Sequence, residues 1–332
     1  QLDCNSQHDQ KNRTPAVRRN GFAVIGAVRS NKGMKQLALA AALALAACAT
    51  AQAQPQSAAC APPGYDRAAL DALKASQWAV ADDTARNALA RALTACLGDP
   101  DPAVRDGIAF EALQAWMRNR QLTNETLAAL NTDLLARLVA ADALGFQRPF
   151  SALVLADVAR TDRVAPWMTV EQRAQLVNAS AAYMRGITDH RGFTPGEGYR
   201  HATAHAGDLM LQLVLNPNVD RAQLTQIRDA IATQVSPGEH FYINGEGERL
   251  ARPILYMAQR DVFTEAEWTA WFTALADDEA SWNDWFLSNA GLARRHNVTA
   301  FVSTIYLNAR LSGQDAFAPL LPGAEAAIRA LP

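Results

Sequence analysis

One amphipathic helical run follows another along most of this chain, and this succession constrains the fold more than any other feature. Leu89, Leu93 and Leu97 are spaced four residues apart, and comparable runs cover residues 123–138 and 220–235. Apolar side chains at this spacing lie on one face of an α-helix. No segment alternates apolar and polar residues over the length of a strand, and helix-forming Ala, Leu, Arg and Gln dominate. The sequence therefore predicts an all-α fold.

The order of these runs also predicts how the helices are arranged. Runs of about 12–20 residues joined by short turns are typical of stacked antiparallel pairs. The stretch 99–106 resembles the entry to a HEAT-type repeat, although the chain has no strict repeat period. We therefore expect an irregular HEAT-like solenoid of helical pairs, an α-α superhelix, forming a single domain over residues 64–332. Its later helices are predicted at 197–215, 220–235, 247–260, 264–276 and 294–312, with another beginning at Pro149.

The N-terminal part has the pattern of a targeting segment. Residues 1–33 are interpreted as upstream sequence or a long leader, and 34–53 as a signal peptide. The apolar run 37–47 has eleven residues, which suits a signal peptide and is too short to cross a bilayer of about 30 Å. It ends in Leu-Ala-Ala-Cys at 45–48, which resembles a bacterial lipobox and predicts lipidation of Cys48.

Simple cleavage after the Ala-Gln-Ala at 51–53 is the alternative to lipidation. In both cases the mature protein is exported. We expect a periplasmic protein, anchored to the outer membrane through lipid on Cys48 if the lipobox is used. A small, polar, proline-containing linker at 54–63 then joins the anchor to the helical domain.

Charge and cysteine content bear on partners and compartment. The first 48 residues hold seven basic and two acidic residues, so the remainder has 24 basic against 31 acidic residues. A net negative domain without a basic stripe argues against a nucleic-acid partner. Besides Cys48, the mature chain retains Cys60 and Cys96. In an oxidising periplasm these two residues would form a disulfide, and the alternative is two unpaired thiols.

The strongest chemical signal lies between Tyr183 and Leu209. A glycine-rich loop there leads into a helix predicted to start near Glu197, with His201, His205 and Asp208 following. At about 100° per residue, these three side chains would project from one narrow helical face. Two imidazoles and a carboxylate so placed would suit a divalent metal, zinc above all.

Two other interpretations of the same residues stay open. The three side chains would equally serve as a polar network that joins neighbouring helices, or as a metal-free ligand or catalytic site. The glutamate of the H-E-x-x-H motif is missing, so the mechanism of the zinc proteases that carry it does not transfer.

The segment 189–208 resembles the uncharacterised bacterial domain-of-unknown-function family 2785. The family typically has an acid–x–Arg–Gly–aromatic loop followed by Gly–aromatic–x–His–x–x–x–His–x–x–Asp. The matching positions are Asp189, Arg191, Gly192, Phe193, Gly198, Tyr199, His201, His205 and Asp208. The resemblance extends over about 80–312, with Tyr199 in place of the usual Trp and Ala206 in place of Gly. It implies an all-helical domain but does not supply an activity, so the function is argued from the site.

Further residues would converge on the same face. A ligand pocket is predicted to include Arg148, Asp189, His190, Tyr199 and Arg249. If a hydrolase operates here, Glu197 or Glu246 would be the general base, and Arg191 would stabilise an anion or oxyanion. For each charge alone, an exposed position or a loop-fixing ion pair is the alternative.

Two functions follow from these residues. The first is a periplasmic binding or scaffolding module, whose pocket is lined by the His201, His205 and Asp208 face and takes a protein or a small envelope ligand. The second is a metal-assisted hydrolase acting on an envelope-derived substrate. Irregular helical solenoids present surfaces more often than they perform chemistry, which favours the binding module.

Overall fold

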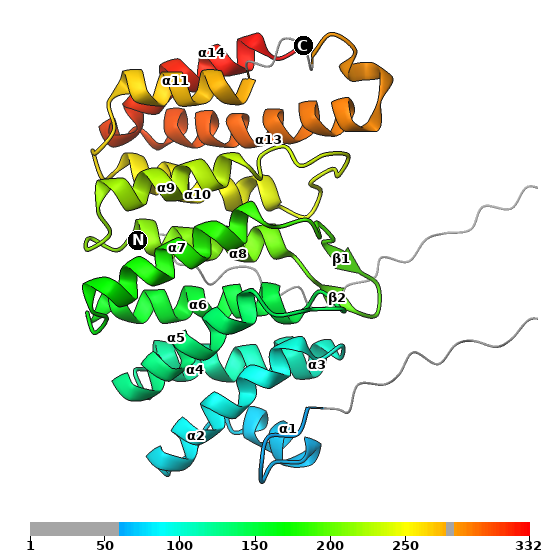
Figure 1. Cartoon of the computed structure of the whole chain (residues 1–332), viewed down its shortest axis with the longest axis vertical. Helices are drawn as coiled ribbons and strands as arrows, with labels where there is room; N and C mark the ends of the chain where they lie inside the picture. The colour runs from blue at the N-terminus through cyan, green and yellow to red at the C-terminus, as the bar shows by residue number, and fades with distance from the viewer. Residues whose placement is uncertain (1–59, 277–281) are drawn as a thin grey trace, which may run out of the picture. The chain divides into compact units, whose positions relative to one another are not determined.

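The computed structural model confirms the all-α prediction (Figure 1). It describes residues 60–276 and 282–332, which belong to one compact unit. The predicted leader, the signal peptide and Cys48 lie outside the described residues. Within these residues, extended structure is limited to the two-residue strands β1 (Phe193–Thr194) and β2 (Gly198–Tyr199).

The first half of the domain contains short helices followed by three long ones. In chain order they are α1 (Arg67–Ala75), α2 (Asp83–Leu93), the 3₁₀-helix η1 (Thr94–Gly98), α3 (Pro102–Val104), the π-helix η2 (Arg105–Phe110), α4 (Glu111–Arg118), α5 (Asn124–Leu138), α6 (Gln147–Val164) and α7 (Val170–Arg185).

After the strands, the chain continues with α-helices of 12 to 24 residues, interrupted by a short 3₁₀-helix, and ends in two shorter elements. They are α8 (Ala202–Val214), α9 (Arg221–Ala232), α10 (Glu246–Ala258), α11 (Glu265–Ala276), the 3₁₀-helix η3 (Trp285–Leu287), α13 (Asn289–Ser312), the 3₁₀-helix η4 (Asp315–Leu320) and α14 (Leu321–Ala330). No helix among the described residues is long and apolar enough to span a bilayer.

Helix starts follow local capping chemistry. The side chains of Asp66, Thr123, Thr169 and Asp220 each accept a hydrogen bond from a backbone N–H three residues further on. These contacts satisfy amide groups that a helix cannot pair internally. Most predicted helices begin within a few residues of their observed starts: α6 begins at Gln147, two residues before Pro149, and α13 at Asn289 rather than 294.

The prediction for 197–215 needs a larger correction. Helix α8 begins only at Ala202, and the glycine-rich residues before it form an antiparallel hairpin. Phe193 pairs with Tyr199 and Thr194 with Gly198 in this hairpin. Gly196 and Gly198 adopt φ of +84° and +77°, a conformation that L side chains rarely adopt. Glycine here therefore marks a turn.

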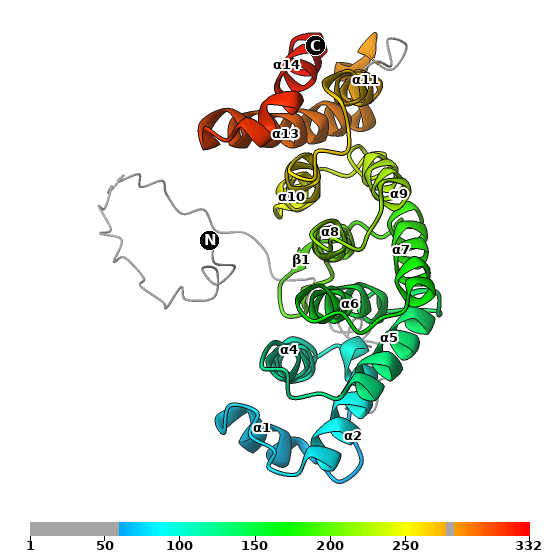
Figure 2. The same cartoon turned by 90° about the vertical axis from the view of Figure 1, so that its left-hand side faces the viewer.

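Helices of the central region lie in two layers (Figure 2). Helices α4, α6, α8 and α10 follow one another in one layer, and α5, α7 and α9 in the other. Helix α8 packs between α6 and α10, while α5 packs on α6 and α7 on α9. Leucine, alanine and aromatic side chains fill the core, including the fully buried Trp116. The assignment of these helices to HEAT-type repeats stays a prediction.

A buried carboxylate joins three parts of this core. Asp162 of α6 is fully buried, and its oxygens accept hydrogen bonds from four groups. The donors are the backbone N–H of Trp167 and Met168, at 3.0 and 2.8 Å, Nε of Arg173 at 2.9 Å, and Nδ2 of Asn216 at 2.8 Å. The carboxylate thereby links α6 to the start of α7 and the turn after α8.

The structure also pairs Cys60 with Cys96 in a disulfide, with Cα atoms 5.2 Å apart. The backbone N–H of Cys60 donates to Oδ2 of Asp99 at 2.9 Å. The N-terminal segment is thus bound covalently to η1, and the disulfide encloses α1 and α2.

Candidate functional site

The hairpin before α8 is held by two buried arginines from different parts of the chain. Arg105 of η2 is fully buried, and its Nη2 donates to the backbone oxygen of Glu197 at 2.8 Å. Arg200 donates to the Leu144 backbone oxygen at 2.8 Å. Both guanidinium carbons lie over the ring of Phe146, at 4.0 and 4.2 Å from its centre. These cation–π contacts and hydrogen bonds fix the hairpin against η2 and the start of α6.

Several charged residues that the sequence places in a pocket or in catalysis make structural contacts instead. The carboxylate of Glu197 accepts from Arg200 at 2.9 Å, and this hydrogen bond lowers the pKa of Glu197. Arg191 pairs with Asp189 two residues earlier. Arg148 donates to the Leu138 backbone oxygen at 2.7 Å and so caps α5. The structure therefore gives these residues loop-fixing and helix-capping contacts, which was the alternative for each charge alone.

His201 lies immediately before α8 and not on its helical face. It adopts the left-handed conformation, with φ of +58°, and its backbone N–H donates to the Arg191 oxygen at 3.0 Å. The ring atom Nε2 lies 3.0 Å from the backbone oxygen of Asn244 and 3.6 Å from Oε1 of Glu246. Because a carbonyl oxygen only accepts, Nε2 carries the hydrogen.

Glu246 is a buried carboxylate with an unused oxygen. It is 1% exposed and opens α10. Its Oε2 accepts from the backbone N–H of Asn244 at 2.8 Å, whereas the buried Oε1 has no hydrogen-bond partner among the described residues. A carboxylate at a helix N-terminus is favoured by the helix dipole. Glu246 thus places a buried carboxyl oxygen 3.6 Å from Nε2 of His201.

Asp208 is engaged by Arg249 and does not join the two histidines. Arg249 of α10 donates to both carboxylate oxygens, through Nε at 2.7 Å and through Nη2. Gly207 permits this close approach of α8 and α10, since a Cβ there would lie 2.8 Å from the Arg249 backbone oxygen. Among the described residues, no group of three His, Cys, Asp or Glu side chains is placed to hold a metal ion. The predicted zinc set is therefore not assembled, because an arginine occupies its carboxylate.

His205 is buried between two aromatic rings. Its ring lies edge-on to Phe150 at 5.0 Å and to His201 at 5.7 Å, and Nδ1 is buried with no hydrogen-bond partner in the described part of the chain. Burial lowers the pKa of His205 well below its ordinary value, and the nearby His201 and Arg249 lower it further. The folded protein therefore keeps this imidazole neutral.

This neutrality predicts a loss of stability in mild acid. The unfolded chain binds a proton on His205 near pH 6.5, whereas the folded chain does not. The free energy of unfolding should therefore fall as the pH drops below about 6.5, by at most ~1.4 kcal/mol per pH unit from this ring. Urea titrations between pH 5 and 8 would measure it, with a shallower decline for His205→Gln. Equal slopes for the two proteins would contradict the prediction.

A second group of rings completes the site, and part of it was not predicted from the sequence. His190 lies 5.7 Å from His240 and 6.2 Å from Tyr242 between ring centres. Nδ1 of His190 and Nε2 of His240 are buried and have no hydrogen-bond partners among the described residues. Burial lowers the pKa of His190. His240 and Tyr242 come from the irregular stretch before Glu246.

A buried asparagine of α13, Asn297, helps to hold that stretch. Asn297 accepts from the Tyr242 backbone N–H and donates to the His240 backbone oxygen, both at 2.8 Å. Asn244 lies so close to Gly192 that a Cβ added to residue 192 would be 2.0 Å from Nδ2 of Asn244. The sequence signal that could have located the site is the cluster His-Phe-Tyr-Ile-Asn at 240–244, directly ahead of Glu246.

Comparison with known proteins identifies a family without an assigned activity. The family model described as "Protein of unknown function (DUF2785)" matches residues 134–307. The match contains β1, β2, α8 and α10, and it is narrower than the 80–312 expected from the sequence. No curated protein and no solved structure matches the chain. Since the match covers more than half of its length, the chain belongs to the DUF2785 family.

Proposed function

We propose that this chain is an exported binding module that recognises a partner protein of the cell envelope through its hairpin. The observation that carries the proposal is an exposed aromatic stack. Tyr199, 42% exposed, stacks on His201 with ring centres 4.9 Å apart and planes 24° apart. Phe193 is 54% exposed and lies 5.1 Å from Tyr199. Exposed aromatic side chains in contact with one another are typical of interaction sites.

The stack has a rigid polar support. Ile243, 77% exposed, lies next to Asn244, whose backbone oxygen accepts from the His201 ring. Glu246 in turn accepts from the Asn244 backbone N–H, and so it holds the residue that orients the ring. We call Phe193, Tyr199, His201 and Ile243 the hairpin face. A preorganised apolar face loses little conformational entropy on binding, so it suits protein recognition.

The disulfide within the domain supports the proposal that the protein is exported. Disulfides such as Cys60–Cys96 persist in oxidising compartments and are rare in the cytosol. We therefore propose a periplasmic location with a lipid anchor at Cys48, which lies outside the described residues. A metal-assisted hydrolase is not proposed, because Arg249 occupies the carboxylate that the metal would need.

Site-specific photocrosslinking tests the binding function. A benzophenone amino acid replaces Tyr199 in the full chain, and envelope material from the source cells is added before irradiation. We expect one crosslinked protein at position 199. The matched control carries the probe at Leu311, which is 80% exposed at the end of α13, and should give none of that adduct. The same adducts at both positions, a small-molecule adduct only, or no adduct would contradict a protein partner.

A further inference from the structure

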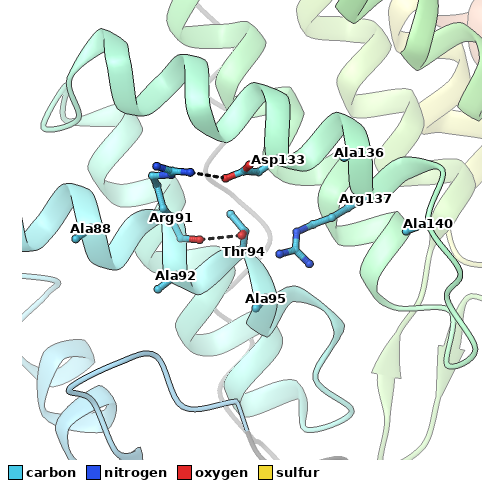
Figure 3. A pocket seen from close by; sticks show the side chains of 9 residues that line it. All are labelled: Ala88, Arg91, Ala92, Thr94, Ala95, Asp133, Ala136, Arg137 and Ala140. Atoms are coloured by element: carbon cyan, nitrogen blue, oxygen red, sulfur yellow. Dashed lines mark hydrogen bonds and ion pairs between the residues drawn. The ribbon is translucent and has the colours of Figure 1, made fainter.

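A groove formed by residues distant in sequence from the hairpin has the features of a small-molecule site. It lies between α2 with η1 on one side and α5 on the other, and its volume is about 740 Å³ (Figure 3). This volume is in the range of about 300–1,000 Å³ found for small-ligand sites. Most of its wall consists of methyl groups from Ala88, Ala92, Ala95, Ala136 and Ala140.

Within the part of the chain that the structure describes, one cation of the groove has no partner. Arg91 pairs with Asp133 at 3.3 Å, so these two charges neutralise each other. Thr94 donates its hydroxyl hydrogen to the Arg91 backbone oxygen at 2.8 Å. The Arg137 side chain has no hydrogen bond or ion pair among the described residues, and its Nε is buried. In Figure 3 its guanidinium reaches from α5 towards Thr94 and Ala95.

The Arg137 guanidinium, which has no partner among the described residues, and the neighbouring alanine methyl groups indicate what kind of ligand the groove would bind. The planar group of arginine pairs with carboxylate and phosphate oxygens through two parallel hydrogen bonds. The alanine wall offers apolar contact, which favours an aliphatic body. We infer that this groove binds a small amphiphile with a carboxylate or phosphate head on Arg137 and a short alkyl body along the alanines. This site is separate from the hairpin face and independent of its proposed function.

Calorimetric titration of the full chain tests the inference with three probes of equal alkyl length. Nonanoate and octyl phosphate carry the two possible head groups on an octyl chain, and octanol carries neither. We expect one or both anions to bind and octanol to bind at least tenfold more weakly, and the tighter anion identifies the head group. Failure of both anions to bind, or equally tight binding of octanol, would overturn the site.

Two variants test whether the ligand contacts Arg137 and the alanine wall. Arg137→Gln should weaken binding of the anion by at least about tenfold, the effect of losing charge-assisted hydrogen bonds. Ala136→Leu should weaken it by filling the groove without disturbing the helix, because leucine is a good helix former. The control Arg310→Gln removes the same charge from an exposed position on α13 and should bind like the wild type. With circular dichroism showing both variants folded, unchanged affinity in Arg137→Gln would contradict the inference.

Discussion

Replacing Asp162 with alanine is expected to lower the free energy of unfolding by about 3–5 kcal/mol. The substitution leaves the Arg173 guanidinium and the Asn216 amide buried without their acceptor, together with two backbone N–H groups. A buried charge that loses its partner is far costlier than an exposed one. Equilibrium unfolding in urea, followed by circular dichroism, measures the change.

The matched control is Asp71→Ala on α1. Asp71 also pairs with an arginine, Arg67, but its side chain is 55% exposed. Exposed pairs contribute at most about 1 kcal/mol, so this variant should unfold almost like the wild type. Comparable losses from Asp162→Ala and Asp71→Ala would show that the buried network does not carry the stability assigned to it.

The same carboxylate should also affect stability in acid. Burial raises the pKa of Asp162, but the hydrogen bonds from Arg173, Met168, Trp167 and Asn216 outweigh it, so the pKa is lowered in the folded protein. Its contribution is therefore complete above the unfolded pKa of about 3.9 and is lost as the pH falls through the folded pKa. Below about pH 4 the wild type should lose stability more steeply than Asp162→Ala.

Removing the Cys60–Cys96 disulfide is expected to cost about 4 kcal/mol. The two residues are 36 positions apart, and the entropy of closing a loop of this length in the unfolded chain corresponds to roughly that free energy. Urea unfolding of the wild type with and without a thiol reductant measures it. The control is the double variant Cys60→Ala, Cys96→Ala, whose stability should not respond to reductant. A wild type equally stable in both conditions would contradict this expectation.

The helices could be predicted because their signals are local. Asp66, Thr123, Thr169 and Asp220 each cap a helix by bonding to an amide three residues away, so the information lies within one turn of the chain. The spacing of apolar residues indicated the element type, and an Asp or Thr ahead of each run indicated its start.

The candidate site could be predicted only in part, because its decisive contacts join distant residues. Asp208 meets Arg249 across 41 positions, and the hairpin is fixed by Arg105, 92 positions before Glu197. Spacing along one helix placed His201, His205 and Asp208 on a common face, but it contained no information about these partners. The left-handed conformation of His201 likewise depends on contacts with Arg191 and Asn244.

The disulfide also determines how the domain would respond to mechanical load. Tension applied at the N-terminal end enters the described chain at Cys60 and passes through the sulfur atoms to Cys96. Helices α1 and α2 lie inside the closed covalent loop, so the pulling force bypasses them. In the oxidised protein the first elements to bear tension are therefore η1 and the segments that follow it, and extension by residues 61–95 becomes possible only after reduction.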